Sequence, residues 1–288
     1  MADKQAHSKA FGNRKDLLER LRKVKHIALD MDGTIYKGDT LFPYTKAFLR
    51  DLEEMGISYS FLTNNPSRST KDYLSHLREM GLHVTENEIY TSAHATMDYL
   101  THHCPDTKKL FILGTPSMIR EFEQAGFVPV ADHPHEEPDA VVVGFDPTLS
   151  FPRLARAAWW ISKNKRYLAT NPDYVCPTDQ PVVLVDCGSI CAALEKATGR
   201  WPDVVLGKPD PDMLNGVRNG KGLEQDEIAM VGDRIYTDLV MAQRANAFSV
   251  LVLSGEATPE DLNKTVLVPD IVVASIEVFG KLLAESRA

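Results

Sequence analysis

Short apolar runs alternate with amphipathic stretches along most of the chain. Residues 15–25 place three leucines on one side of a helix and charged residues on the other, which predicts an amphipathic helix. Residues 26–32 then form a short, mainly apolar run that ends in Gly33 and Thr34, which is typical of a buried strand followed by a turn. One helix and one strand are therefore expected at the start of the fold.

The same alternation continues on both sides of a middle segment. Before that segment, residues 45–55 and 70–80 have helical patterns and residues 57–62 have a strand pattern, and a glycine follows each helix. Alternating strands and helices predict an α/β fold built on a doubly wound parallel sheet. Beyond the middle segment the returning strands are expected at Asp203–Leu206, Ile228–Val231 and Phe248–Leu253.

The middle segment repeats this pattern within itself, with loops rich in proline, histidine and acidic residues between its elements. It has enough strand and helix signals for a core of its own, so we expect an inserted α/β domain. The predicted division is 15–103 for the first part of the core domain, 104–201 for the inserted domain and 202–288 for the second part of the core domain.

Polar residues follow the predicted strands of the core domain. Asp30 and Asp32 close the first strand, and Thr63 follows the second. Lys208 and Asp233 follow two of the returning strands. Because open α/β sheets bind their ligands at the carboxyl ends of the strands, we expect Thr63, Lys208 and Asp233 to converge on Asp30.

Asp30 and Asp32 lie two positions apart at a strand end, where a solvated Asp-Gly turn would explain them equally well. Two close carboxylates repel each other unless a cation neutralises them, and hard oxygen ligands of this kind select Mg²⁺. Asp233 would add a metal ligand and Asp238 a support. One aspartate of the first pair is then a candidate nucleophile, and another is a candidate proton donor.

The other turns supply groups that bind phosphate. Lys208 offers a point charge, while the Thr63 hydroxyl and the Asn64 backbone N–H can donate to phosphate oxygens. Phosphoryl transfer requires mainly positioning and charge stabilisation. The combined pattern therefore indicates phosphoryl transfer.

Composition and charge narrow the choice of partners. The chain has 32 Lys and Arg against 40 Asp and Glu, a formal net charge of −8, and no domain-length basic stretch, which favours a small molecule over a nucleic acid. The apolar runs are too short to span a membrane, and residues 1–14 lack the apolar centre of a secretory signal, so we expect a cytoplasmic protein. Its four cysteines are expected to be reduced, with Cys187 and Cys191 packed in a core.

Four stretches of the chain carry a resemblance to a known family. They are Asp30-Met31-Asp32-Gly33-Thr34-Ile35-Tyr36, Leu62-Thr63-Asn64-Asn65-Pro66-Ser67, Gly207-Lys208-Pro209-Asp210-Pro211, and Val231-Gly232-Asp233-Arg234 through Thr237-Asp238. They resemble the motifs of the haloacid dehalogenase superfamily, and in particular of its type IIA capped phosphatases, a group that includes p-nitrophenyl phosphatases and nucleotide and sugar-phosphate phosphatases. The resemblance covers nearly everything from residue 24 onward, and it implies a Rossmann-like core with an inserted α/β cap domain.

The resemblance also implies roles for individual residues. Asp30 would be the nucleophile that forms an aspartyl-phosphate, and Asp32 would be the general acid and base. Thr63 and Lys208 would bind the phosphate. Asp30, the Asp32 backbone carbonyl and Asp233 would bind Mg²⁺. The dehalogenase branch has no second aspartate at the position of Asp32, which favours a phosphate ester over a halide as substrate.

The cap segment of the family resembles residues 169–173 here. Asn171, Asp173 and Tyr174 are candidates for contact with the organic part of the substrate, although a turn after a strand explains them almost as well. The cap would act as a lid that selects the leaving group. Capped relatives often dimerise, so a homodimer is one of the states that the resemblance implies.

Three functions compete. The leading one is Mg²⁺-dependent hydrolysis of a small phosphorylated metabolite, such as a nucleotide or a sugar phosphate. A phosphomutase shares the paired aspartates but is disfavoured by the cap type. A non-enzymatic, phosphorylatable receiver-like module also clusters aspartates and a lysine, but such modules are much shorter and have no inserted domain.

Overall fold

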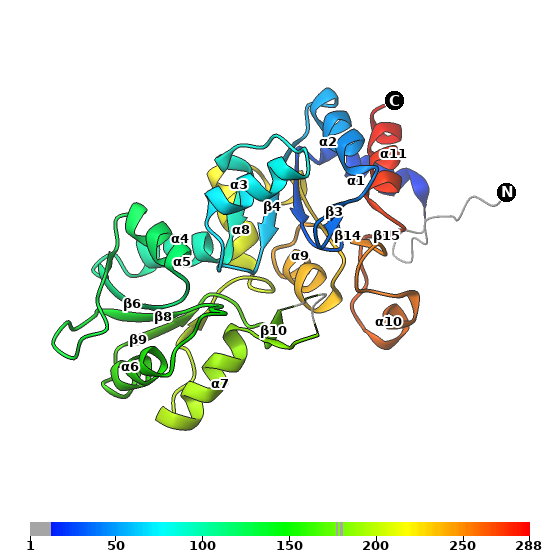
Figure 1. Cartoon of the computed structure of the whole chain (residues 1–288). Helices are drawn as coiled ribbons and strands as arrows, with labels where there is room; N and C mark the ends of the chain where they lie inside the picture. Colours follow the sequence, from blue (N-terminus) through cyan, green and yellow to red (C-terminus); the bar gives the residue numbers. More distant parts are fainter. Residues whose placement is uncertain (1–12, 177, 179–180) are drawn as a thin grey trace. The chain divides into compact units, whose positions relative to one another are not determined.

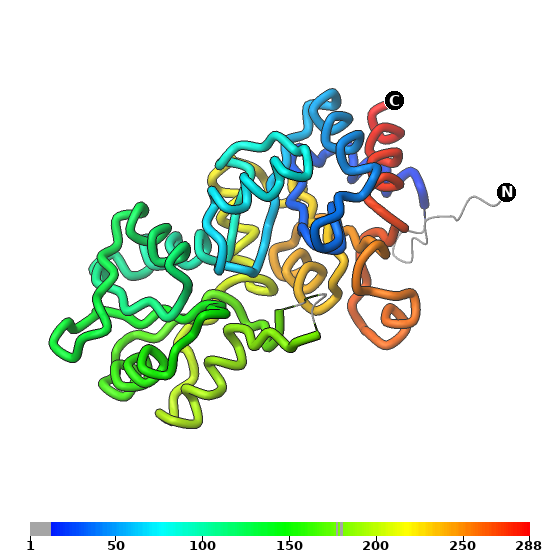
Figure 2. The backbone as a smooth tube through the Cα atoms, in the orientation of Figure 1, coloured from blue at the N-terminus to red at the C-terminus, as the bar shows by residue number. Residues whose placement is uncertain are grey.

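The structure of the protein is a computed structural model that describes residues 13–176, 178 and 181–288. Within these residues the chain forms two compact units, and each is built from separate stretches of sequence. Figure 2 follows the backbone, and both its dark blue and its orange-to-red stretches belong to the first unit. No helix in the described part of the chain is long and apolar enough to cross a membrane.

Of the described residues, the first unit contains 13–62, Leu77–Ile89 and Leu214–Ala288. The second unit contains Thr63–His76 and Tyr90–Met213. The chain passes from the first unit to the second at the ends of two strands, after Leu62 and after Ile89. The predicted domain boundaries at residues 104 and 201 stay predictions.

A six-stranded sheet, in the order β15-β14-β13-β1-β4-β5, lies at the centre of the first unit. Its strands are β1 (His26–Asp30), β4 (Ser58–Thr63), β5 (Ile89–Thr91), β13 (Ile228–Gly232), β14 (Phe248–Val252) and β15 (Ile271–Val273). Strand β1 is parallel to both of its neighbours, with Leu29 opposite Val231 and Asp30 opposite Leu62. Strands β13 and β14 are buried along their whole length, as expected for a parallel sheet covered on both faces. This register puts the carboxyl ends of β1 and β13 side by side.

Helices α1 (Arg14–Lys23), α2 (Thr45–Glu54) and α11 (Ile276–Arg287) pack together in the first unit (Figure 1). Their contact includes the rings of Phe48 and Phe279, whose centroids lie 6.4 Å apart. The remaining elements of this unit are a hairpin of β2 (Tyr36–Lys37) and β3 (Thr40–Leu41), the short turns η1 (Glu86–Glu88) and η2 (Gln225–Glu227), the π-helical turn η3 (Ile235–Leu239), α9 (Val240–Arg244) and α10 (Pro259–Lys264). Helices α3 (Thr70–Glu79) and α8 (Pro211–Gly220) contribute residues to both units.

The second unit has its own parallel sheet, in the order β12-β9-β8-β6-β7. Its strands are β6 (Lys109–Leu113), β7 (Val128–Pro129), β8 (Ala140–Val143), β9 (Arg166–Ala169) and β12 (Val204–Val205). Its helices are α4 (Ser92–His103), α5 (Pro116–Gln124), α6 (Phe151–Ser162) and α7 (Cys187–Thr198), and it carries an antiparallel hairpin of β10 (Val175–Cys176) and β11 (Leu184–Val185). The predicted α/β fold, with a parallel core sheet and further cap-like sheet elements, is confirmed.

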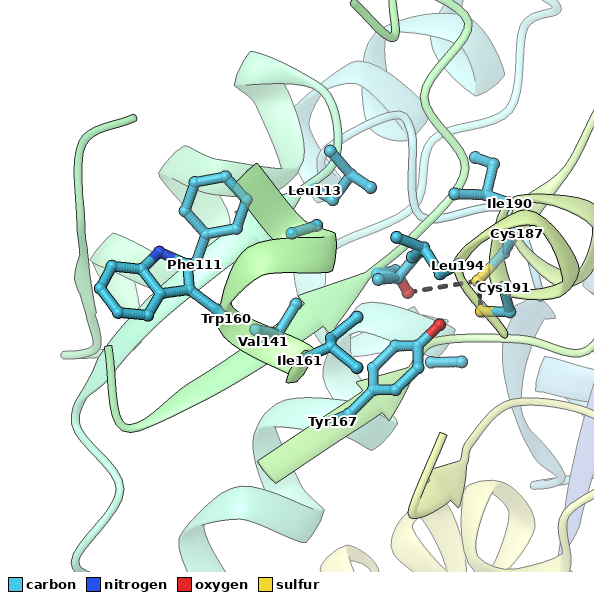
Figure 3. Close-up of a cluster of buried hydrophobic side chains, with 13 residues drawn as sticks. Phe111, Leu113, Val141, Trp160, Ile161, Tyr167, Cys187, Ile190, Cys191 and Leu194 are labelled. Carbon is cyan, nitrogen blue, oxygen red and sulfur yellow. Dashed lines mark hydrogen bonds between the residues drawn. The ribbon is translucent and has the colours of Figure 1, made fainter. Parts of the chain in front are cut away.

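One hydrophobic core of the second unit lies between its sheet and helices α6 and α7 (Figure 3). Tyr167 and Ile161 are fully buried there, together with both cysteines of α7. The Cys187 thiol donates to the Val143 carbonyl at 3.2 Å, and its sulfur lies 4.0 Å from that of Cys191. The prediction that these two cysteines pack in a core is confirmed, and all four cysteines are free thiols.

Candidate active site

Three aspartates of the first unit gather at the carboxyl ends of β1 and β13. Asp30 is the last residue of β1, Asp233 follows β13 directly, and Asp238 lies on the π-helical turn η3. Each offers a carboxylate oxygen, and these oxygens all lie within 4.8 Å of one another. Asp233 and Asp238 are each 2% exposed, whereas Asp30 is half-buried. The site therefore has one accessible carboxylate and two buried ones.

Glycines make room for these carboxylates. A Cβ atom at Gly33 or Gly255 would overlap the carboxylate of Asp233, and one at Gly232 would overlap that of Asp238. Gly33 also has a φ of +84°, a backbone conformation that other residues adopt only with strain. The loop after β14, which contains Gly255, therefore packs directly on the acidic cluster.

Backbone amides hold the buried carboxylates in place. The Glu256 N–H donates to Asp233 Oδ2 at 2.7 Å, and the Arg234 N–H donates to Asp238 Oδ2 at 3.2 Å. The other oxygen of Asp233, Oδ1, is buried and has no hydrogen-bond partner among the described residues. Burial, followed by the negative charges of Asp30 and Asp238, raises the pKa of Asp233 to about 8.

The donor set fits a divalent cation. Three carboxylates this close repel one another unless a positive charge compensates them. Carboxylate oxygens are the ligands that Mg²⁺ and Ca²⁺ prefer, and the unpartnered Asp233 Oδ1 has a lone pair to offer. Asp238, predicted only as a support, belongs to the same group of oxygens as Asp30 and Asp233.

Asp32 occupies a different position in the same loop. Its side chain is half-buried and its Oδ1 accepts a hydrogen bond from the Gly38 N–H at 3.2 Å, so it lies against the β2–β3 hairpin. The turn before that hairpin is closed by a bond from the Gly33 N–H to the Tyr36 carbonyl at 2.7 Å. The carboxyl group of Asp32 is thus separate from the three gathered carboxylates.

The predicted phosphate-binding residues belong to the second unit. The Thr63 hydroxyl accepts from the Asn65 N–H at 3.2 Å and lies 3.5 Å from the hydroxyl of Tyr73, whose pKa burial raises to about 12. Lys208 is only 4% exposed. The Asn64 side chain bonds to the backbone of Lys208 and to the carboxylate of Asp173, a contact that sequence reasoning did not foresee.

The predicted cap residues differ in exposure. Asn171 is fully buried and donates to the carboxylate of Asp186, the residue that caps the N-terminus of α7, at 3.1 Å. Tyr174 is 61% exposed, but its carbonyl accepts from the Asp186 N–H at 3.0 Å. The ring of Tyr174 is therefore accessible while its backbone is fixed.

Known proteins with similar sequences bear directly on this site. The model of the haloacid dehalogenase-like hydrolases matches residues 27–128, and that of the HAD-hydrolase-like proteins matches residues 205–278. The ribonucleotide monophosphatase NagD of Escherichia coli is 30% identical over 253 residues, which is 88% of this chain and 97% of NagD. The chain belongs to the haloacid dehalogenase-like hydrolase family. The two matched regions contain Asp30, Asp32, Asp233 and Asp238.

Solved structures of family members place the chain among the type IIA phosphatases. The 4-nitrophenylphosphatase of Thermotoga maritima is 40% identical, with a TM-score of 0.86 over 91% of this chain and 98% of that one. A glycerol phosphate phosphatase of Mycobacterium tuberculosis, solved in complex with magnesium, is 29% identical, with a TM-score of 0.81 over 89% of this chain and 77% of that one. The protein is a phosphoric monoester hydrolase. This activity favours the phosphatase hypothesis over the phosphomutase and the receiver-like alternatives.

Proposed function

We propose that the protein hydrolyses small phosphate monoesters in a Mg²⁺-dependent reaction that passes through an aspartyl-phosphate on Asp30. The observation that carries this proposal is the gathering of Asp30, Asp233 and Asp238, with the buried Asp233 Oδ1 unpartnered in the described structure. A half-buried carboxylate beside two buried ones combines a group that substrate can reach with groups suited to a cation.

In the first step the Asp30 carboxylate attacks the phosphorus atom, and the bond to the leaving alcohol breaks. Asp32, whose side chain lies outside the group of three, donates a proton to the leaving oxygen. In the second step Asp32 takes a proton from water, the resulting hydroxide attacks the phosphorus, and inorganic phosphate leaves Asp30 as a free carboxylate. Atoms and charges balance over the two steps.

The Mg²⁺ would be held by Asp30, the Asp32 backbone carbonyl and Asp233, with Asp238 in support. When bound, it supplies positive charge that offsets the carboxylates and the phosphate. Thr63, the Asn64 backbone N–H and Lys208 would bind the phosphate oxygens, and the burial of Lys208 strengthens the interaction of its charge with an anion. These roles rest on the sequence motifs and on the local contacts of each residue.

The substrates of the relatives guide the choice of ester. They act on ribonucleotide monophosphates, 4-nitrophenyl phosphate and glycerol phosphate. We propose that this protein acts on a metabolite of the same size class and that residues 104–201, including Asn171, Asp173 and Tyr174, select its organic part. The cytoplasmic location and the homodimer stay predictions.

Asp30→Asn tests the nucleophile. The amide is nearly isosteric but cannot attack phosphorus, so the hydrolysis of 4-nitrophenyl phosphate in Mg²⁺ should be abolished while the melting temperature stays close to that of the wild type. Stopped colorimetric assays and thermal melts on the same preparations would measure both. A folded variant that keeps a tenth of the wild-type rate would remove Asp30 from the reaction.

A further inference from the structure

The Asn64 side chain forms hydrogen bonds with both backbone polar groups of a single residue, Lys208. Its Oδ1 accepts from the Lys208 N–H at 2.6 Å, and its Nδ2 donates to the Lys208 carbonyl at 2.8 Å. A side chain that bonds to the N–H and the C=O of the same residue fixes the position of that backbone on two points. These two bonds therefore also fix the Cα of Lys208, from which the lysine side chain extends.

A third contact fixes the orientation of this amide. Asn64 Nδ2 donates its second hydrogen to Asp173 Oδ2 at 2.9 Å. An ionised carboxylate can only accept, so a flipped amide would place its oxygen against both the Asp173 carboxylate and the Lys208 carbonyl. Asp173 thereby selects the one orientation in which Asn64 suits the Lys208 backbone. Asn171 Nδ2 lies 3.4 Å from the same Asp173 oxygen.

The surroundings of the amide leave it little freedom. The Ser92 hydroxyl donates to the Asn64 carbonyl at 2.8 Å, so the backbone of Asn64 is held as well as its side chain. The residue before Lys208 is a glycine with a φ of +75°, and a Cβ there would lie 2.6 Å from the Thr170 carbonyl oxygen and 2.8 Å from Asn64 Oδ1. Gly207 thus permits the close approach between the two loops.

We infer that Asn64 is a positioning residue for Lys208 and that Asp173 orients Asn64 for this purpose. The inference rests on the proposed function, in which Lys208 binds the substrate phosphate. It gives the Asn64 side chain a role beyond that of its backbone N–H. It also makes Asp173 part of the phosphate-binding apparatus in addition to any contact with the organic part of the substrate.

A double-mutant cycle tests the inference. The dissociation constant of inorganic phosphate would be measured by calorimetry in Mg²⁺ for the wild type, Asn64→Ala, Lys208→Met and the double variant. Misplacing a binding group by about an ångström costs up to roughly 100-fold, so Asn64→Ala should weaken binding at least 10-fold in the wild-type background. In the Lys208→Met background it should change binding less than about 2-fold, because the group that it positions is already gone.

Two further variants sharpen the result. Asp173→Ala removes the carboxylate oxygen that accepts from Asn64 Nδ2 and leaves Asn64 and Lys208 themselves unchanged. It should therefore weaken phosphate binding less than Asn64→Ala does, and again only when Lys208 is present. This variant carries the test if Asn64→Ala fails to fold. Asn65→Ala is the matched control, because the Asn65 side chain accepts from Ser67 and not from Lys208. Its effect should be the same in both backgrounds.

The outcomes separate the inference from the proposed function. If Asn64→Ala weakens phosphate binding by the same factor with and without the lysine, Asn64 acts through its own backbone N–H or through the fold, and the inference is overturned while the role of Lys208 stands. If Lys208→Met binds phosphate as tightly as the wild type, the proposed role of Lys208 fails, and the positioning role fails with it.

Discussion

The carboxylate of Asp233 is enclosed on several sides by backbone. Gly33 and Gly255 approach it so closely that neither position has space for a Cβ, and the Glu256 N–H bonds to its Oδ2. The energy needed to bury this acid is offset only in part by that hydrogen bond, because its Oδ1 has no partner within the described residues. A tight enclosure with one unpartnered oxygen is an arrangement in which small steric changes should have large effects.

Gly255→Ala should damage the site without altering any charge. Its new methyl group would overlap Asp233 Oδ2, so the carboxylate must move or the loop must shift. We expect kcat/KM for 4-nitrophenyl phosphate to fall at least 10-fold, the Mg²⁺ concentration for half-maximal activity to rise, and stability to fall by about 1–3 kcal/mol. Gly220→Ala is the control, because a Cβ at that glycine would meet no atom within 4 Å. Wild-type activity in Gly255→Ala would show that the enclosure is not needed.

His26 links stability to pH through its burial. It is fully buried at the start of β1, and its Nδ1 lies 2.7 Å from the Ser58 hydroxyl. Burial, with a smaller contribution from Lys221, lowers the pKa of His26 to about 3. The unfolded chain therefore binds a proton at this residue below about pH 6.5, whereas the folded protein does not until about pH 3. Stability from this residue is complete above pH 6.5 and declines as the pH falls from there.

Urea melts at pH 7.5, 6.5 and 5 would measure this effect. Between pH 6.5 and 5 the wild type should lose about 2 kcal/mol more stability than His26→Asn, which can still bond to Ser58 but cannot take up a proton. His133→Asn alters an exposed loop histidine and should keep the wild-type slope. Parallel pH profiles for the wild type and His26→Asn would contradict the assignment.

At the scale of elements, helices and strands could be predicted where apolar and polar residues alternate clearly along the sequence. Strands such as β1 and β13 are apolar runs bounded by polar turns, and they lie within two residues of the predicted ranges. Helix α4 was not predicted, because the side chains that it buries are mainly small alanines, serines and threonines that give little amphipathic contrast. Strands of two residues, as in the β10–β11 hairpin, are too short to carry any period.

Some features of the candidate site could likewise be predicted from the sequence, and others could not. The aspartates that follow strands could be predicted, since each lies next to a clear apolar run in the sequence. The contacts of Asn64 could not, because Lys208 and Asp173 are both more than a hundred positions away. Asp238 lies on the π-helical turn η3, an element that no hydrophobic pattern reveals.

Tyr174, which precedes β10, tests whether the hairpin contributes to selectivity. Its carbonyl accepts from the Asp186 N–H and from the Ser189 hydroxyl, so Tyr174→Ala removes an exposed ring and leaves the backbone contacts in place. If the ring contacts the organic part of the substrate, relative kcat/KM values across nucleotides, sugar phosphates and glycerol phosphate should shift by about 10-fold, while 4-nitrophenyl phosphate changes less.

The control for this prediction removes another exposed aromatic ring from the same unit. Phe151→Ala, at a residue that is 79% exposed on α6, should leave the selectivity unchanged. Assays of both variants over one substrate panel would give the comparison directly. A uniform decrease for every ester in Tyr174→Ala would argue against a selective role for the hairpin.

Over the whole molecule, negative charge is the main obstacle to binding a phosphate ester. The chain carries a formal net charge of −8, and three carboxylates gather in the first unit. The long-range field of such a protein repels a phosphate dianion, so binding depends on local positive charge. A bound divalent cation would supply that charge where the carboxylates are most concentrated, and its effect should be measurable on the folded protein as well as on turnover.

Removal of divalent cations should therefore lower both stability and activity, but the two should recover differently. A cation that binds only the folded protein stabilises it by mass action, so both Mg²⁺ and Ca²⁺ should raise the melting temperature after treatment with EDTA. Only Mg²⁺ should restore the hydrolysis of 4-nitrophenyl phosphate well, because the looser and higher coordination of Ca²⁺ misplaces the attacking oxygen. Asp233→Ala should behave like the chelated enzyme in both measurements. Full activity after exhaustive chelation would exclude a catalytic metal. If Mg²⁺ raised the melting temperature of Asp233→Ala as much as that of the wild type, the cation would bind elsewhere on the protein.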